Sequence, residues 1–156
     1  MEQTLIVLKP DAVHRQLVGR IIDRFERKGL KIAAIKMLEV SADLARRMYA
    51  PHEGKDFYEP LMEFITAGPV VAMIVEGEKA IAVCRQMVGP TFGPDAPAGT
   101  IRGDFGMSRR YNLVHASDGD ESARQEIALF FRPEEIIDYE LHGTRWIYAR
   151  LGDELI

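Results

Sequence analysis

One histidine, His115, has neighbours of the types that make a side-chain nucleophile. It lies in the segment Asn112–Asp118 (NLVHASD), and in an extended strand Ser117 would point to the same face. A helix is expected to begin directly after this segment, and helix N-termini favour anions. Glu126, about two turns into that helix, could accept a hydrogen bond from one imidazole nitrogen and leave the other as a nucleophile. On the pattern alone, a strand-end histidine without a role is the more frequent alternative.

Residues suited to phosphate binding surround a loop that precedes this histidine. Eight of the eighteen residues 89–106 are Gly or Pro, and long ordered loops in compact domains are usually functional. Arg85 comes just before the loop, whereas Thr91 and Arg102 lie within it. Guanidinium groups match phosphate oxygens well, and Lys9 ends the first expected strand, where ligand clefts often open. Each residue alone is more often a solvated charge, but their occurrence beside the histidine segment favours an anion site.

The common nucleotide and metal motifs are absent from the sequence. No two of the 13 glycines are two positions apart, which excludes a G-x-G-x-x-G loop. The only Gly-Lys pair, Gly54–Lys55, lacks the first glycine of a P-loop. Protein-kinase motifs and zinc-site spacings are also missing. Any nucleotide would therefore be bound by less common elements.

Composition indicates one globular domain spanning residues 1–156. The chain is 47% hydrophobic and 28% charged with a net charge of −4, and its basic residues are scattered, which argues against a nucleic-acid partner. The single cysteine, Cys84, cannot form an intrachain disulfide, which fits a reducing compartment. The N-terminus lacks the features of a signal peptide, and no apolar run approaches the roughly 18 residues of a membrane span. We therefore expect a cytoplasmic protein with no membrane partner.

Periodicity and turn residues predict the elements that position these groups. The expected strands are residues 4–9, 30–40, 70–75 and 112–117, and the expected helices are residues 17–28, 42–50, about 56–68, 78–88 and about 118–130. Ser41 should cap the second helix, and capping boxes are expected at Asp56–Glu59 and Asp118–Glu121. This order reduces to a ferredoxin-like βαββαβ core of the α+β class. It predicts a four-stranded antiparallel sheet with helices on one face, a core of about residues 1–135 and a C-terminal tail of about residues 136–156.

Several of these segments resemble the nucleoside diphosphate kinase family, and the resemblance covers nearly the whole chain. The segments that carry it are Thr4–Val13 (TLIVLKPDAV), Leu17–Gly29, Gly68–Val70, Gly99–Gly106 (GTIRGDFG) and Asn112–Asp118, followed by Glu121–Ser122 and Glu126–Ile127. The Asn-x-x-His-(Gly/Ala)-Ser-Asp pattern is highly specific to that family. This pattern favours His115 as the nucleophile over a strand-end histidine without a role.

The resemblance implies a kinase that transfers the terminal phosphate of a nucleoside triphosphate, typically ATP, to a nucleoside diphosphate. It implies a ping-pong mechanism through phosphohistidine on His115, with Glu126 orienting the ring, Ser117 supporting it, and a role in maintaining nucleoside triphosphate pools. The residues implied to bind the nucleotide are Lys9, Tyr49, His52, Phe57, Arg85, Thr91, Arg102 and Asn112. Phe57 would stack on the base, and Lys9 and Asn112 would also reach the sugar. The implied cofactor is Mg²⁺ held through the phosphates without direct protein ligands, and the implied assembly is a hexamer or tetramer.

Two departures from the family pattern and two alternatives bear on these expectations. Pro51 lies between Tyr49 and His52 and should tilt His52, and the loop 91–99 differs in sequence but not in apparent length. One alternative is a catalytically silent nucleotide-binding regulatory module, and the other is a nucleic-acid-binding protein.

The C-terminal tail is rich in large apolar residues, and such exposed groups usually mark contacts. It is predicted to pack on a neighbouring subunit with Trp146 as an anchor, and to supply no catalytic group. Packing back on its own subunit is the alternative.

Overall fold

The computed structural model describes residues 1–152, 154 and 155, and an antiparallel sheet of four strands forms its centre. The strands are β1 (Glu2–Leu8), β2 (Lys31–Glu39), β3 (Pro69–Gly77) and β4 (Val114–Ala116). Their order in the sheet is β2-β3-β1-β4, with β1 and β3 paired from Glu2↔Gly77 to Leu8↔Val71. This is the order of a ferredoxin-like sheet, so the predicted α+β fold is confirmed.

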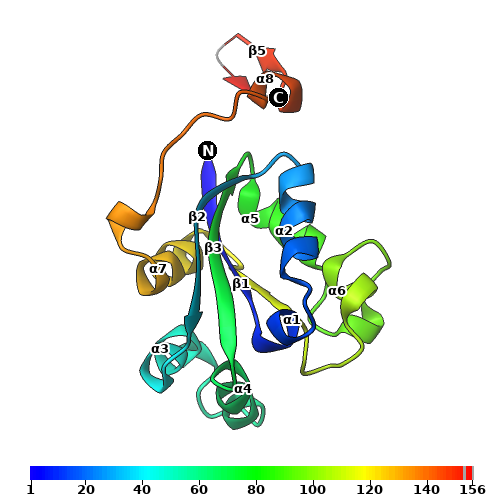
Figure 1. Ribbon diagram of the computed structural model, residues 1–156, viewed down its shortest axis with the longest axis vertical. Helices are drawn as coiled ribbons and strands as arrows, with labels where there is room; N and C mark the ends of the chain where they lie inside the picture. The colour runs from blue at the N-terminus through cyan, green and yellow to red at the C-terminus, as the bar shows by residue number, and fades with distance from the viewer. Residues whose placement is uncertain (153, 156) are drawn as a thin grey trace.

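Helices alternate with the strands along the chain (Figure 1). They are α1 (Pro10–His14), α2 (Val18–Arg27), α3 (Ala42–Met48), α4 (Tyr58–Ile65), α5 (Ala80–Val88), α6 (Ile101–Phe105), α7 (Asp120–Phe130) and α8 (Thr144–Ile147), with single 3₁₀ turns at Ala50–His52, Gly93–Asp95 and Pro133–Glu135. The helices α1 and α6 are short, and the sequence patterns did not predict them. A small hairpin of β5 (Arg150–Leu151) and β6 (Glu154–Leu155) follows α8.

The prediction that helices cover only one face of the sheet is wrong. In β1, Ile6 and Leu8 belong to a core layer shared with α1, α2, α5 and α6, whereas Leu5 and Val7 belong to a second layer shared with α3, α4 and α7. All four side chains are fully buried. The unbroken apolar runs of β1 and β3 account for this arrangement, because strands without polar alternation are buried on both faces.

The predicted helix caps were partly right. Ser41 caps α3, since its Oγ accepts a hydrogen bond from the Leu44 amide at 3.1 Å. At the next site the structure differs, because α4 begins at Tyr58 with Phe57 in the N-cap position and no side-chain cap. Asp56 follows a series of tight turns that begins at Tyr49, and a capping residue needs extended backbone.

The cap of α7 lies one residue later than the sequence suggested. Gly119 takes the N-cap position, and the Ser122 Oγ accepts a hydrogen bond from the Gly119 amide at 3.0 Å. The same hydroxyl donates to the Asp118 carboxylate at 2.6 Å, so Asp118 does not cap the helix directly.

The chain after α7 contacts its own subunit as far as Tyr148, whose hydroxyl accepts a hydrogen bond from the Glu78 amide at 3.1 Å. The Ile137 amide donates to the Ala33 carbonyl at 2.8 Å, and the Tyr139 hydroxyl donates to the Ile32 carbonyl at 3.0 Å. From there it runs as an extended arm that ends beyond the tip of the sheet near the N-terminus (Figure 1). Among the described residues, none of the helices has both the length and the apolar character needed to cross a membrane.

Candidate active site

The histidine singled out by the sequence lies on the edge strand β4, where both helical layers can reach it. His115 pairs with Val7 of β1, whose side chain belongs to the layer of α3, α4 and α7. Directly paired residues of antiparallel strands point to the same side. The imidazole therefore faces α3 and α7, while helices of the other layer approach from beyond the sheet edge.

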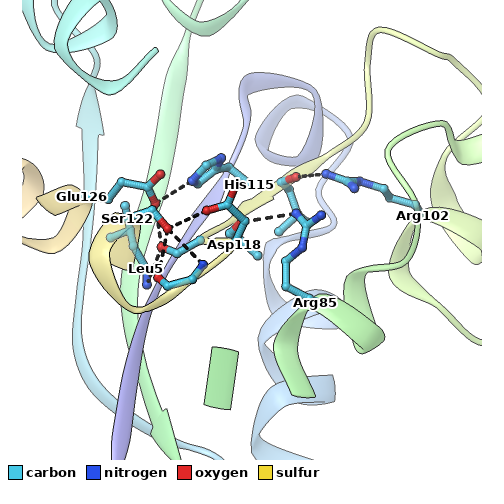
Figure 2. A network of polar contacts seen from close by, with 11 residues as sticks. Leu5, Arg85, Arg102, His115, Asp118, Ser122 and Glu126 are labelled. Atoms are coloured by element: carbon cyan, nitrogen blue, oxygen red, sulfur yellow. Dashed lines mark hydrogen bonds and ion pairs between the residues drawn. The ribbon is translucent and has the colours of Figure 1, made fainter. Parts of the chain in front are cut away.

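A short chain of hydrogen bonds fixes the histidine ring (Figure 2). The His115 Nε2 lies 2.8 Å from the Glu126 Oε2 of α7, and the Ser117 hydroxyl donates to the same oxygen at 2.6 Å. The Ser117 oxygen in turn accepts a hydrogen bond from the Leu5 amide of β1 at 3.3 Å. A carboxylate only accepts hydrogen bonds, so Nε2 carries a proton and Nδ1 is the nitrogen left with a lone pair.

Two basic side chains approach β4 from the opposite direction to Glu126 (Figure 2). Arg102 of α6 is 3% exposed, and its guanidinium donates to the carbonyls of Gly89, Asn112 and Val114 at 3.0, 3.1 and 2.6 Å. Arg85 of α5 donates to the Ala116 carbonyl at 3.4 Å and is otherwise exposed. A guanidinium has five N–H donors, so Arg102 holds the loop and retains donors for an anion.

Lys9 and Asn112 join the end of β1 to the loop that precedes β4. The Lys9 ammonium donates to the Asn112 Oδ1 at 2.7 Å, and the Asn112 Nδ2 donates to the Thr91 carbonyl at 2.9 Å. Lys9 and Asn112 are buried, whereas Thr91 is exposed. The loop departures between residues 91 and 99 have therefore not separated Thr91 from these two residues.

Three aromatic rings form a row from His115 to the molecular surface. Tyr49 meets His115 edge-on with ring centroids 6.1 Å apart, His52 stacks on Tyr49 at 6.2 Å, and Phe57 contacts His52 at 5.4 Å. The 3₁₀ turn that contains Pro51 keeps His52 within this row. Phe57 at the outer end is 48% exposed, so its ring is free to stack on a ligand.

Burial and positive charge set the electrostatics of the site. Burial, followed by the charge of Arg102, lowers the pKa of Lys9 to about 8, while Asp11 opposes this shift. Burial and the nearby Arg85 lower the pKa of Arg102 to about 10. Burial raises the pKa of Tyr49 far above its usual range. Two crowded cations that lose solvation in this way will favour a bound polyanion.

Three charged residues at the site were not singled out from the sequence. Lys55 donates to the His52 Nδ1 at 3.1 Å and lies 5.7 Å from the centre of the Phe57 ring. The Asp118 carboxylate, whose pKa is lowered chiefly by the Ser122 hydrogen bond, lies beside His115 and Arg85. Asp11 accepts a hydrogen bond from the Leu113 amide at 3.1 Å. The position of Asp11 directly after Lys9 and Pro10 was the available signal for it.

Among the described residues, no group of three or more His, Cys, Asp or Glu side chains is placed to hold a metal ion. What converges here is an oriented imidazole, cationic and amide donors, and an exposed ring. Such a set suits transfer of a phosphoryl group, which depends mostly on positioning and on stabilisation of charge.

Comparison with known proteins identifies the family. A sequence profile described as nucleoside diphosphate kinase matches residues 2–136. Nucleoside diphosphate kinases from Staphylothermus marinus and Kosmotoga olearia are 55% and 52% identical, over 88% and 90% of this chain and 98% and 96% of theirs. A halophilic nucleoside diphosphate kinase from Halobacterium salinarum, solved in complex with CDP, superposes with a TM-score of 0.93 at 43% identity over 95% of this chain and 99% of its own. The Aquifex aeolicus enzyme superposes with a TM-score of 0.85 at 41% identity over 87% and 99%. The chain therefore belongs to the nucleoside diphosphate kinase family, whose members are enzymes that transfer phosphate between nucleotides.

Proposed function

We propose that this kinase carries the phosphoryl group on His115 between two half-reactions. The observation that carries the proposal is the 2.8 Å contact between the His115 Nε2 and Glu126, because it leaves Nδ1 as the nucleophile. Ser117 holds the same carboxylate oxygen at 2.6 Å, so the ring orientation is set before any substrate binds. Donor and acceptor nucleotides have nearly the same shape, and a covalent carrier lets one site serve both in turn.

In the first half-reaction, the Nδ1 lone pair attacks the terminal phosphorus of the nucleoside triphosphate. The N–P bond forms as the bond from phosphorus to the bridging oxygen breaks, and the nucleoside diphosphate leaves with that oxygen. In the second, a terminal oxygen of the acceptor diphosphate attacks the same phosphorus and releases His115. The Nε2 proton stays on the ring and donates its hydrogen bond to the Glu126 carboxylate throughout, which stabilises positive charge on the ring.

Phosphate recognition falls to Lys9, Arg85 and Arg102, with Thr91 and Asn112 beside them. Guanidinium forks and an ammonium group supply the charge that phosphoryl transfer requires. Mg²⁺ bound with the nucleotide would neutralise part of the remaining phosphate charge. The described residues offer no carboxylate cluster for it, so the nucleotide and water molecules would hold the ion.

The exposed ring of Phe57 would hold the base, with His52 and Tyr49 lying between it and His115. An aromatic face stacks on every base, whereas discrimination requires polar groups at the base edges. We therefore propose broad base acceptance, and we extend to this chain the nucleotide binding that the CDP complex of the Halobacterium salinarum enzyme displays.

Exposed apolar surface supports a homo-oligomer of the hexameric or tetrameric kind. Strand β2, at the edge of the sheet opposite β4, bears Ile35 and Met37, which are 51% and 61% exposed. The tail bears Trp146, which is 82% exposed. Apolar side chains in such numbers usually mark contacts between proteins. The single, buried cysteine Cys84 fits a cytoplasmic enzyme.

A catalytically silent nucleotide-binding module is the alternative, and the intact pairing of His115 with Glu126 counts against it. The test is a transfer assay with ATP labelled in its terminal phosphate and a different nucleoside diphosphate as acceptor. Double-reciprocal plots at several acceptor concentrations should give parallel lines, as a covalent carrier requires. Intersecting lines would indicate direct transfer in a ternary complex, and absence of transfer would favour the silent module.

A further inference from the structure

A strained turn lies directly before the nucleophile strand. Leu113 is fully buried and has a φ of 70°, in the left-handed region that non-glycine residues rarely adopt. The Val114 amide donates to the Asn112 carbonyl at 2.8 Å, which closes a three-residue γ-turn around Leu113. A γ-turn whose central φ is positive is a rare and strained form. Such a conformation persists only when surrounding contacts enforce it.

Two contacts from the end of β1 and the start of α1 hold this turn in place. The Asp11 Oδ2 accepts a hydrogen bond from the Leu113 amide at 3.1 Å, and the Lys9 amide donates to the Leu113 carbonyl at 2.8 Å. The amide and the carbonyl of Leu113 are therefore both hydrogen-bonded by residues 9–11. The other carboxylate oxygen of Asp11 is also buried, and no group of the described chain bonds it. Hydrogen bonds from an amide to a charged carboxylate are stronger than those to a neutral acceptor.

The turn sets two groups of the site at once. On one side of Leu113, the Asn112 Oδ1 accepts a hydrogen bond from the Lys9 ammonium at 2.7 Å, and the Asn112 carbonyl accepts one from the Arg102 Nε at 3.1 Å. On the other side, the Val114 carbonyl accepts a hydrogen bond from the Arg102 guanidinium at 2.6 Å, and His115 follows directly. If Leu113 relaxed to a negative φ, the path of the chain between Asn112 and His115 would change, and displacement by about 1 Å can slow a positioned reaction about a hundred-fold.

We propose that Asp11 is a positioning residue for the phosphoryl transfer, acting through the Leu113 amide on His115 and Asn112. The inference rests on the proposed phosphohistidine, but the contact itself can be tested without it. A merely structural alternative is that Asp11 stabilises the first turn of α1 as an acidic residue near a helix N-terminus. That role would change thermal stability without changing the reaction rate of the folded chain.

The test compares three variants in a single-turnover measurement of phosphate transfer from ATP–Mg²⁺ to the protein. Asp11→Ala should lower the rate at saturating ATP by about a hundred-fold, with the half-saturating ATP concentration changed much less. Asp11→Asn keeps an acceptor oxygen and should recover the rate to within about ten-fold of the unmodified chain. Asp43→Ala is the control, because Asp43 also lies in the first turn of a helix, is exposed, and lies outside the site. It should react at the unmodified rate.

The second readout is the backbone amide resonance of Leu113, which should shift upfield in Asp11→Ala and little in Asp11→Asn. Should Asp11→Ala not fold, Asp11→Ser, too short to reach the amide, takes its place. An unchanged Leu113 resonance and an unchanged rate in the truncated variant would overturn the inference, and so would an Asp11→Asn rate as low as the truncated one. If the unmodified chain accepts no phosphate, the proposed function fails, and the amide resonance alone decides whether Asp11 enforces the turn.

Discussion

The surroundings of His115 and the C-terminal arm, residues 137–152, differ in which side chains they bury. Polar side chains are buried around His115, whereas large apolar side chains are exposed in the arm. Around His115, polar and charged side chains such as Lys9, Arg102 and Ser117 are withdrawn from water, and each has hydrogen-bond partners within the same chain. In the arm, Trp146 and Leu151 are 82% and 70% exposed. Most buried polar groups in proteins are hydrogen-bonded, whereas exposed large apolar groups usually mark contacts with a partner surface.

Under the proposed assembly, this difference separates the part that one chain completes alone from the part that depends on a neighbouring subunit. The site is preorganised because elements of both layers, α5, α6 and α7, converge on an edge strand of only three residues. The family profile ends at residue 136, where the arm begins. We therefore expect the chemistry to be insensitive to the arm, and the assembly to depend on it.

The largest effect is expected at His115 itself. His115→Ala removes the carrier, and transfer should fall by at least about a thousand-fold, which corresponds to about 4 kcal/mol. The matched change in the arm is His142→Ala, an exposed histidine that should leave the transfer rate unaltered. Steady-state transfer assays on both variants measure the contrast. Comparable losses in the two would erase the proposed distinction between the regions.

A smaller loss is expected at the outer end of the aromatic row. Phe57→Ala should weaken the binding of all nucleotides by a similar free energy, about 1–3 kcal/mol, because stacking on an aromatic ring does not distinguish the edges of the bases. Titrations with a purine and a pyrimidine nucleoside diphosphate measure it. A loss confined to one base would show that a polar group reads the base after all.

A pH dependence should come from Lys9. Burial lowers its pKa to about 8 in the folded chain, so the ammonium is present below that pH and is lost as the pH rises through it. Apparent nucleotide affinity should therefore decline above about pH 8, by up to about ten-fold per pH unit for a single titrating cation. Lys9→Arg, whose charge persists, should flatten this limb, and an identical profile in the variant would assign the decline to another group.

The smallest effect on turnover is expected from the arm. Deleting the residues after Tyr139 should reduce the assembly size or thermal stability, because the deletion removes Trp146, the proposed anchor on a neighbouring subunit. Turnover per folded chain should stay the same, since every proposed site residue precedes the deletion. Size measurement by light scattering with parallel assays checks both. An unchanged oligomer of unchanged stability would rule out the interface role, and lost turnover in an intact oligomer would give the arm a role in the site.

Much of the fold could be predicted from the sequence, because hydrophobic periodicity reports on local elements. The four strands and the long helices followed from it, and the apolar runs in β1 and β3 also contained the signal for burial on both faces. The cap at Gly119 could not be predicted, because the Asp118 side chain bonds the Ser122 hydroxyl and does not cap the helix directly. The helix α6 was hidden because a Gly-rich stretch favours a loop by composition.

Periodicity and residue chemistry alone predicted less of the site than the family motif did. The pairing of His115 with Glu126 followed from strand and helix periodicity, but Tyr49, His52 and Phe57 came only from the family resemblance, because nothing local brings them near His115. The positive φ of Leu113 had no local signal either. Contacts far along the chain impose that conformation, and leucine itself disfavours it.

The most direct test of the central claim is the stoichiometry and position of bound phosphate. The protein would be incubated with ATP–Mg²⁺ without an acceptor, freed of nucleotide, and analysed by mass spectrometry under neutral and acidic conditions. If His115 carries the phosphoryl group, we expect one phosphate per chain, located on His115, lost in acid, and discharged when a nucleoside diphosphate is added. Phosphate on another residue, or efficient transfer with His115 never modified, would contradict it.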